Sequence, residues 1–369
     1  MLFIHNTISL CNHCYKHIPA IVYEDDDSIK MAKKCSTHGV LHSTVEVDPE
    51  FYYALQHYTD IETFNQVLFE ITDRCQLNCP HCYHLPDNKI VDKDLALIIE
   101  QVKKFPQDSM PMFAGAEPTL RKDFVEMCAA VKELDFKEFT LLSNGVKFAD
   151  KAFTKNCFEA GLSQLCLGLN HYSYQGSKVH DKQLKALDNL LDTGYTLGYV
   201  GYTIESLNDV SDILEEIQLI DNKKIEHYRI RCGSFIGRSL DKERSYLSNL
   251  VKKVKSILGS EVQYGYYDDN PYHVTLKWGD RILRLIQWPD VTNIDLEELA
   301  TGPWCNFYEG PITNFVHQVI TRDAFINMKL PKLDVVPTKY QYRSMSIKFP
   351  HWKHSWTAPV PFKRFDWDL

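Results

Sequence analysis

The sequence lacks any long apolar run. No part of its 369 residues approaches the stretch of about 18 uninterrupted apolar residues that crosses a bilayer. The first residues, Met-Leu-Phe-Ile-His-Asn, also lack the basic segment and the apolar stretch of a secretory signal. We therefore expect a soluble, cytoplasmic protein without a membrane span.

An excess of basic charge is also missing. The formal net charge is −8, whereas proteins that bind nucleic acid non-specifically usually have a basic surface. The 11 cysteines are odd in number, and several stand in short metal-type spacings rather than in a disulfide framework. This cysteine usage favours a reducing compartment and metal binding. The negative net charge makes nucleic acid a less favoured partner.

The first metal-type pattern lies near the N-terminus. It consists of two x2-spaced pairs with the ligand set Cys11, Cys14, Cys35 and His38. Three thiolates and one imidazole predict a zinc-ribbon or rubredoxin-like knuckle, in which Zn²⁺ is favoured over iron. His13 and His17 compete for the imidazole position, and a set of unrelated cysteines is the alternative. A metal here would fold a short segment that has little core of its own.

A second pattern, C-x3-C-x2-C, supplies three thiolates at Cys75, Cys79 and Cys82. It follows the apolar segment 64–72, which we predict to be a buried strand, so the cysteines fall on the loop after that strand. In a cubane [4Fe–4S] cluster, three thiolates leave one iron open to a ligand that is not protein. The alternatives are an electron-transfer cluster and a zinc site completed by a nearby histidine.

Strand-like and helix-like segments alternate over residues 64–233. Six strands and five helices in alternation predict an α/β fold with a parallel sheet, either an open barrel or a doubly wound sheet. The predicted strands are 64–72, 110–114, 139–143, 164–170, 197–204 and 228–232, and the predicted helices are 92–105, 123–134, 150–160, 182–193 and 209–220. We expect Asp123 and Asp209 to be N-caps, and Gly161 and Gly194 to follow helix ends in left-handed conformations.

The pattern changes after Gly233. A helix is predicted at 242–258, followed by a hairpin of 272–277 and 281–287 that turns at 278–280. The last part of the chain is irregular, aromatic and basic, and we expect it to pack across the open side of the domain.

Chemically useful side chains follow several predicted strands. Gly115, Ala116, Glu117 and Pro118 form a small-residue turn with a carboxylate after the second strand. The others are Ser143 and Asn144 after the third strand, Asn170 after the fourth, and Arg229, Arg231 and Cys232 on the sixth. The C-terminal ends of barrel strands are where active sites are built. The two arginines alternate with apolar neighbours, so we expect them on one face, where a guanidinium could bind a carboxylate or phosphate.

The C-x3-C-x2-C loop, the aromatic Tyr83 directly after it and the Gly-Ala-Glu-Pro turn resemble the radical S-adenosylmethionine (radical SAM) superfamily. The resemblance implies an open, partial (β/α)6 barrel of the TIM type, and a [4Fe–4S] cluster on the three cysteines whose open iron is chelated by SAM. It implies that Glu117 accepts a hydrogen bond from the methionine ammonium. The other residues that we expect around SAM are Tyr83, Gly115, Ala116, Pro118, Ser143, Asn144, Asn170, Arg229 and Arg231. Ala116 departs from the family pattern, which usually has a second glycine there.

The knuckle ahead of such a core resembles a group that includes dihydropterin methyltransferase-like and tetraether-lipid-synthase-like enzymes. We therefore expect a metal-binding module at 1–60, a radical SAM core at 61–240 and an irregular α+β extension at 241–369. The resemblance implies reductive cleavage of SAM to a 5′-deoxyadenosyl radical, which abstracts hydrogen from a small-molecule or modified-nucleotide substrate. The outcome would be C–C bond formation, group transfer or rearrangement.

The resemblance also implies an external one-electron donor such as flavodoxin or ferredoxin. Cys232 is a candidate hydrogen-atom donor, with simple packing as the alternative. A different class of function is a zinc-stabilised nucleic-acid-binding module that uses the knuckle and the aromatic tail without radical chemistry.

Overall fold

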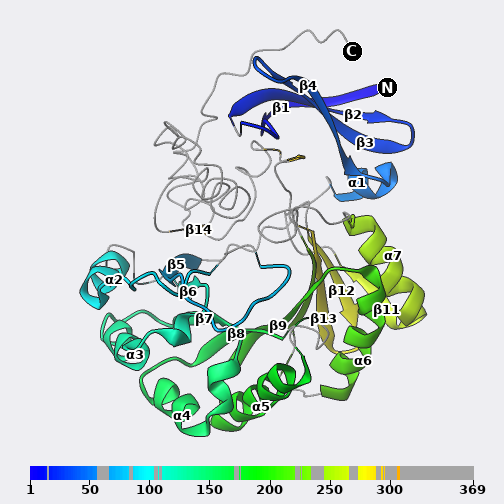
Figure 1. Cartoon of the computed structure of the whole chain (residues 1–369). Coiled ribbons are helices and arrows are strands. Elements are labelled where there is room, and N and C mark those ends of the chain that lie inside the picture. The colour runs from blue at the N-terminus through cyan, green and yellow to red at the C-terminus, as the bar shows by residue number, and fades with distance from the viewer. Residues whose placement is uncertain are drawn as a thin grey trace.

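The structure, a computed structural model, describes residues 1–14, 16–55, 66–82, 86–103, 107, 110–169, 174, 176–220, 225, 227–233, 245–265, 273–287, 292–293, 295 and 306–307 (Figure 1). Of residues 54–55, 66–68, 263–265, 273 and 306–307 it describes the backbone alone. The described part contains a four-stranded and a ten-stranded sheet. None of its helices combines the length and the apolar character needed to pass through a membrane.

The four-stranded sheet is an antiparallel meander at the N-terminus. Its strands, in spatial order, are β1 (Leu2–Leu10), β2 (His17–Asp25), β3 (Ser28–Cys35) and β4 (Gly39–Glu46). Helix α1 (Pro49–Leu55) covers it, with Tyr52 packed among Ala20, Val22 and Met31. Because successive strands run antiparallel, the β1–β2 and β3–β4 turns meet at one end of the sheet, and these turns carry the two predicted ligand pairs, Cys11 with Cys14 and Cys35 with His38.

In the large sheet, strands β5 to β10 are parallel and neighbour one another in chain order. The alternating elements are β5 (Gln66–Thr72), α2 (Leu95–Val102), β6 (Met110–Gly115), α3 (Phe124–Lys132), β7 (Thr140–Ser143), α4 (Lys151–Glu159), β8 (Gln164–Gly168), α5 (Ser177–Thr193), β9 (Thr196–Ile204), α6 (Val210–Ile220) and β10 (His227–Cys232). They are followed by α7 (Leu247–Leu258), β11 (Val262–Gly265), β12 (His273–Trp278), β13 (Arg281–Ile286) and β14 (Asn306–Phe307). The predicted alternation of six strands and five helices is confirmed.

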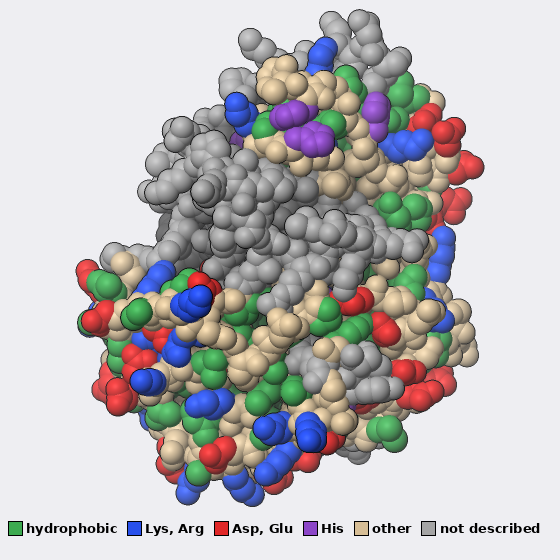
Figure 2. Space-filling model, viewed as in Figure 1, with side chains coloured by type: hydrophobic (Ala, Val, Ile, Leu, Met, Phe, Trp, Pro, Cys, Tyr) green, Lys and Arg blue, Asp and Glu red, His purple; other side chains and the backbone are tan. Residues whose placement is uncertain are grey.

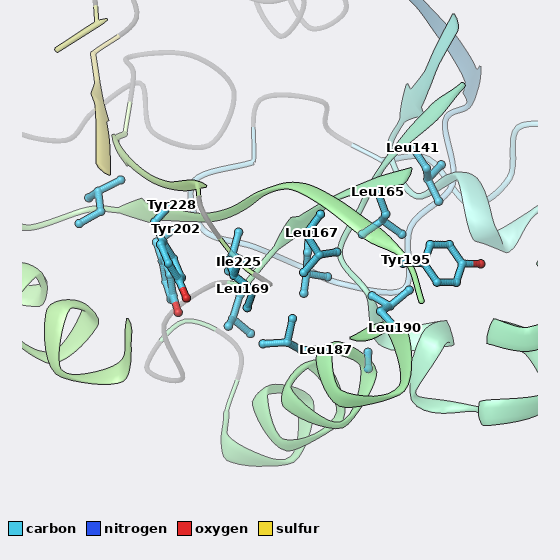
Figure 3. Packing of buried hydrophobic residues seen from close by; sticks show 14 of the residues in the cluster. Leu141, Leu165, Leu167, Leu169, Leu187, Leu190, Tyr195, Tyr202, Ile225 and Tyr228 are labelled. Carbon is cyan, nitrogen blue, oxygen red and sulfur yellow. The ribbon is translucent and has the colours of Figure 1, made fainter. Parts of the chain in front are cut away.

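The sheet is open. β5 pairs with β14, and β10 pairs with β13, so the first and sixth strands of the alternation do not meet. Its helices share one hydrophobic core on one face of the sheet, whereas a doubly wound sheet has helices on both faces. Figure 3 shows part of this core, where Leu165 and Leu167 of β8 lie beside Leu187 and Leu190 of α5. The fold is therefore the predicted open, partial (β/α)6 barrel.

One of the two predicted helix caps is wrong. Asp123 occupies the predicted N-cap position of α3 but makes no side-chain cap bond, because the guanidinium of Arg121 holds its carboxylate at 2.7 and 2.9 Å. Asp209 does not cap α6 but ends a short 3₁₀ turn that Ser206 caps. Gly194 closes α5 in the left-handed conformation that was predicted, with φ of 103°.

The segment after β10 adds further strands to the same sheet. β12 and β13 form the predicted antiparallel hairpin, which turns at Gly279 (φ 60°) and Asp280. β13 then lies parallel to β10, so the predicted C-terminal extension contributes to the wall of the barrel. The predicted covering of the open side by the last part of the chain lies outside the described residues.

Candidate active site and metal centre

The cysteines of the second pattern lie on the loop that leaves β5. Cys75 is buried, and the loop turns at Cys79 and Cys82, where the Cys82 amide donates to the Cys79 carbonyl over 3.2 Å. Burial, together with the nearby Glu117 carboxylate and the other two thiols, raises the pKa of the Cys75 thiol to about 12, although the hydrogen bond from the Leu77 amide opposes the rise. A thiol of this kind is held as a thiolate by a bound metal cation rather than by the protein alone.

Several amides hold Cys75 in place. Its backbone N–H donates to Asn88 Oδ1 and its carbonyl accepts from Asn88 Nδ2, each over 3.0 Å. Its sulfur accepts from the Leu77 amide at 3.3 Å and from Asn144 Nδ2 at 3.7 Å. Hydrogen bonds to sulfur stabilise negative charge there and tune iron–sulfur clusters. Asn88 has no motif around it, so no sequence pattern indicated this role.

Glu117 is a fully buried carboxylate at the C-terminal end of β6. Its Oε1 accepts from the Thr119 amide (3.2 Å), the Thr119 hydroxyl (2.5 Å) and the Ser143 hydroxyl (2.9 Å). Its Oε2 accepts from the Asn144 amide at 2.8 Å. Burial raises the pKa of Glu117, and these hydrogen bonds oppose that rise. The predicted residues Glu117, Ser143 and Asn144 thus lie together.

The turn that carries Glu117 is bonded to the start of the cysteine loop. The Ala116 amide donates to the Thr72 carbonyl, and the Glu117 amide donates to the Arg74 carbonyl, each over 2.9 Å. Gly115 is required for this close approach, because its φ is 122° and a Cβ there would lie 2.3 Å from the Thr72 oxygen. Pro118 begins a short 3₁₀ helix directly after Glu117 and is buried. The Gly-Ala-Glu-Pro run and the cysteine loop therefore form one unit.

Two arginines that the sequence analysis did not single out fix this unit to the sheet. Arg74 forms an ion pair with Asp92 and donates to the Leu120 carbonyl at 2.9 Å. Arg121, which is 3% exposed, donates to the Ile71 and Lys93 carbonyls, each over 3.0 Å. Each arginine thereby ties residues of the β5 end to segments that follow later in the chain.

Asn144 connects the two halves of the site. Besides its bonds to Glu117 and Cys75, its Oδ1 accepts from Gln76 Nε2 at 3.1 Å and from the Val146 amide at 3.1 Å. Its carbonyl accepts from Gln183 Nε2 of α5 at 2.8 Å. Asn144 therefore links the cysteine loop, the carboxylate and the helix layer.

The residues predicted on the sixth strand divide between its two faces. Arg229 and Arg231 of β10 lie on the face turned away from the helices, where Arg231 Nη2 donates to Thr203 Oγ1 at 3.2 Å. Cys232 lies on the other face, 1% exposed, within the helix-side core. The expectation that Cys232 donates a hydrogen atom is therefore corrected to the packing alternative, since its thiol does not share the arginines' face. Tyr83 and Asn170 lie outside the described residues.

The N-terminal pairs form a compact donor set. Cys11 Sγ and Cys35 Sγ each lie 3.4 Å from His38 Nδ1, and Cys14 Sγ lies 3.9 Å from Cys35 Sγ. The four donor atoms lie within 4.8 Å of one another. A zinc tetrahedron with Zn–S of about 2.3 Å has edges of about 3.8 Å, so the set fits Zn²⁺. Although burial opposes it, hydrogen bonds from the Thr37 and His38 amides and from the His38 ring lower the pKa of Cys35 to about 6.

A buried lysine adjoins this donor set. Lys33 is fully buried, donates to the Leu10 carbonyl at 2.8 Å and contacts Asn12 Oδ1. One Zn²⁺ with three thiolates and a neutral imidazole has a net charge of about −1. The ammonium group of Lys33, on the strand β3 that ends at Cys35, offsets this charge. Figure 2 shows histidine side chains gathered on the exposed surface of this sheet.

The N-terminal sheet is attached to the barrel by polar contacts. Glu46 accepts from the Ser248 hydroxyl of α7 at 2.5 Å, and Asp48 pairs with Lys252 at 2.7 Å. His5 also pairs with Asp295 at 2.7 Å. The zinc-type module is therefore part of the folded body rather than a separate appendage.

Comparison with known proteins agrees with this architecture. Residues 69–217 match the model of the radical SAM superfamily, and residues 3–46 match the HMPTM N-terminal zinc ribbon domain. The chain thus contains a radical SAM domain. A zinc ribbon domain stands in front of it, as the sequence patterns predicted.

Curated relatives support the same placement. A 7,8-dihydro-6-hydroxymethylpterin dimethyltransferase of Methanocaldococcus jannaschii is 27% identical over 55% of this chain and 48% of its own length. An Fe-coproporphyrin III synthase of Methanosarcina barkeri is 28% identical over 52% of each chain. A probable GTP 3′,8-cyclase of Saccharolobus islandicus is 25% identical over 41% of this chain and 51% of its own length. The chain therefore spans about half the length of the curated relatives it matches.

The residues present fit the cofactors of the superfamily, a [4Fe–4S] cluster and SAM. Three thiols converge on one loop, and amides approach the Cys75 sulfur. The buried Glu117 carboxylate, which raises the pKa of Cys75 by its charge, lies within electrostatic reach of these thiols. Three cysteines leave one iron for SAM, and a carboxylate nearby is suited to an ammonium group.

Proposed function

We propose that this chain is a radical SAM enzyme. Cys75, Cys79 and Cys82 would hold a [4Fe–4S] cluster, which when bound supplies the electron that splits the C5′–S bond of SAM into methionine and a 5′-deoxyadenosyl radical. The observation that carries the proposal is the link from the Cys75 sulfur through Asn144 to the buried carboxylate of Glu117.

The chain's own residues would position SAM. Glu117 would accept a hydrogen bond from the methionine ammonium, and its bonds to Thr119, Ser143 and Asn144 fix the carboxylate so that it does not reorganise on binding. The backbone of Gly115 and Ala116 would line the same position. Ser143, Asn144 and, beyond the described residues, Tyr83 and Asn170 would contact the rest of SAM.

The substrate that we propose is a small molecule or a modified nucleotide. The curated relatives are named for a pterin, for Fe-coproporphyrin III and for GTP, which supports this class without selecting among its members. Hydrogen abstraction from it would lead to C–C bond formation, group transfer or rearrangement. The nucleic-acid-binding alternative is not favoured, because the family match covers the catalytic core.

An external one-electron donor of the flavodoxin or ferredoxin type is the proposed partner, with the cytoplasm as its site of action. A groove of about 690 Å³ supports it, since Gln76, which contacts the Cys75 sulfur and Asn144, lines the groove. Four lysines line the same groove, namely Lys147, Lys151, Lys182 and Lys185. Figure 2 shows Lys and Arg side chains over the region of α4 and α5. Such a patch favours association with an acidic protein.

The test uses protein purified and reconstituted without oxygen. We expect a brown protein that contains iron, sulfide and zinc and that, when reduced with dithionite, converts SAM to 5′-deoxyadenosine and methionine. Cys79→Ala should lose the colour and the cleavage and keep the zinc. Cys157→Ala, a buried cysteine of α4, is the matched control and should keep all three. Full SAM cleavage by Cys79→Ala would contradict the proposal.

A further inference from the structure

Three arginines lie on the face of the sheet that is turned away from the helices. Arg229 and Arg231 belong to β10, and Arg284 of β13 stands directly beside Arg229 in the parallel register. Residues in register on adjacent strands point to the same face, so the side chains of Arg229 and Arg284 share this face. A guanidinium group offers a fork of donors that matches the oxygens of a phosphate or a carboxylate.

The ring of Tyr199 holds the side chain of Arg229 in place, but no carboxylate of the described residues neutralises its positive charge. Its guanidinium carbon lies 3.8 Å from the centroid of the Tyr199 ring. Tyr199 reaches this position across Gly201, where a Cβ would lie 2.9 Å from the ring. The Nε of Arg229 is buried without a hydrogen-bond partner, and among the described residues Arg229 has no ion pair. Burying a charged donor in this state is unfavourable unless a ligand completes it.

The same face changes character along the sheet. Over β6 to β9 it is apolar, formed by Met112, Ala114, Leu142, Cys166 and the ring of Tyr199. Over β10 and β13 it is cationic, and Tyr199 stands at the boundary. A ligand that lies across this boundary has an apolar or flat part and an oxyanion at one end.

We propose that Arg229 and Arg284, assisted by Arg231, form a subsite for an oxyanion group of the substrate, a phosphate or a carboxylate. The apolar part of the substrate would lie along β6 to β9, toward the end of β6 where Glu117 holds SAM. The proposal rests on the proposed function and specifies its substrate class. Arg229 is then a substrate-binding residue. Arginine suits this role better than lysine, because its guanidinium group can donate two parallel hydrogen bonds to one oxyanion.

The test measures anion binding directly, by calorimetric titration of the anaerobic holoenzyme with inorganic phosphate and, separately, with malonate. Arg229→Gln should weaken binding of the preferred anion by about 10-fold to 100-fold, the effect of losing charge-assisted hydrogen bonds. Arg229→Lys should fall between Arg229→Gln and the unaltered protein. The phosphate and carboxylate arms show which oxyanion the subsite takes.

Arg281→Gln is the matched control, because it removes the same charge from β13, the strand of Arg284, but on the opposite face, where the Arg281 guanidinium lies 5.2 Å from the centroid of the Trp278 ring. It should bind both anions like the unaltered protein. Absence of binding for both anions, or equal weakening by Arg229→Gln and Arg281→Gln, would overturn the subsite.

SAM cleavage without substrate separates this proposal from the proposed function. We expect the control Arg281→Gln to form 5′-deoxyadenosine at the unaltered rate when reduced with dithionite, and we expect Arg229→Gln to lose more affinity for the preferred anion than for SAM. Loss of SAM binding in this variant would assign Arg229 to the cofactor and overturn the substrate role. If no variant cleaves SAM but phosphate still binds through Arg229, the proposed function fails and the anion site stands.

Discussion

Replacing Gly115 by alanine tests how tightly the carboxylate turn is fitted to the cysteine loop. Gly115 ends β6 with φ of 122°, and an added Cβ would lie 2.3 Å from the Thr72 carbonyl oxygen and 3.2 Å from the Thr72 nitrogen. These atoms are backbone, so no side chain can rotate away. The same carbonyl accepts the hydrogen bond from the Ala116 amide, which the substitution would break.

The expected loss of stability has two parts. A non-glycine residue at such a φ costs about 1–3 kcal/mol. Overpacking against backbone adds about 1–3 kcal/mol. Gly176→Ala isolates the first part, because Gly176 has φ of 80° and nothing within 4 Å of its Cβ position. We therefore expect Gly115→Ala to be destabilised by about 2–6 kcal/mol, and by more than Gly176→Ala.

Denaturant unfolding of the two variants, followed by circular dichroism, measures this difference. Because Thr72 leads into Arg74 and Cys75, Gly115→Ala should also bind less iron and form less 5′-deoxyadenosine, whereas Gly176→Ala should retain both. Equal destabilisation of the two variants, with unaltered iron content, would refute the reasoning that the turn and the loop are one unit.

Two further predictions concern the metal module and the lysine groove. His38→Ala removes one of four zinc ligands, so zinc affinity should fall and amide hydrogen exchange in β1 to β4 should become faster, with the iron content unchanged. The control is His42→Ala, which removes a contact to the Tyr23 hydroxyl and should keep the zinc. The double variant Lys182→Glu, Lys185→Glu should slow cluster reduction by a flavodoxin, most strongly at low salt, and leave reduction by dithionite unchanged. Lys34→Glu on the N-terminal sheet is the control for that charge reversal, and an equal effect would exclude the groove as the donor's docking surface.

Much of the architecture was predictable because the signals are local. Each predicted strand of the alternation appears within a few residues of its expected bounds, since apolar runs are separated by helices with periodic apolar faces. The spacing of two pairs predicted the N-terminal donor set, whose four donor atoms lie within 4.8 Å of one another. The cluster ligands Cys75, Cys79 and Cys82 stay a prediction. Asp123 stands at its predicted N-cap position without a cap bond, because Arg121, two residues earlier, binds its carboxylate. The cap predicted at Asp209 was wrong, because Ser206 caps a 3₁₀ turn that ends at Asp209.

The arginine subsite could not be predicted from the sequence, because it depends on the register between strands that are far apart in the chain. Arg284 stands beside Arg229 only because β13 returns parallel to β10 after a helix and a hairpin, and no spacing rule encodes that contact. The face on which Cys232 lies, in contrast, could be predicted from the sequence. Side chains alternate along a strand, so Cys232 and its neighbour Arg231 point to opposite faces. A hydrogen-atom donor to a substrate beside Arg229 and Arg231 would have to share their face, and Cys232 does not.

The two proposed partners approach the site from different sides, and this separation has a chemical reason. The lysine groove is lined by residues of the helix layer, from the 3₁₀ turn before α4 and from α4 and α5, and it meets the cysteine loop at Gln76. The arginines and the apolar strip lie on the strand face turned away from the helices. Asn144 stands between them, bonded to Gln76, to the Cys75 sulfur and to Glu117. In the proposed reaction an electron would thus enter from the helix side while the substrate occupies the strand side, so that a protein donor would not displace the substrate and water would not reach the carbon radical.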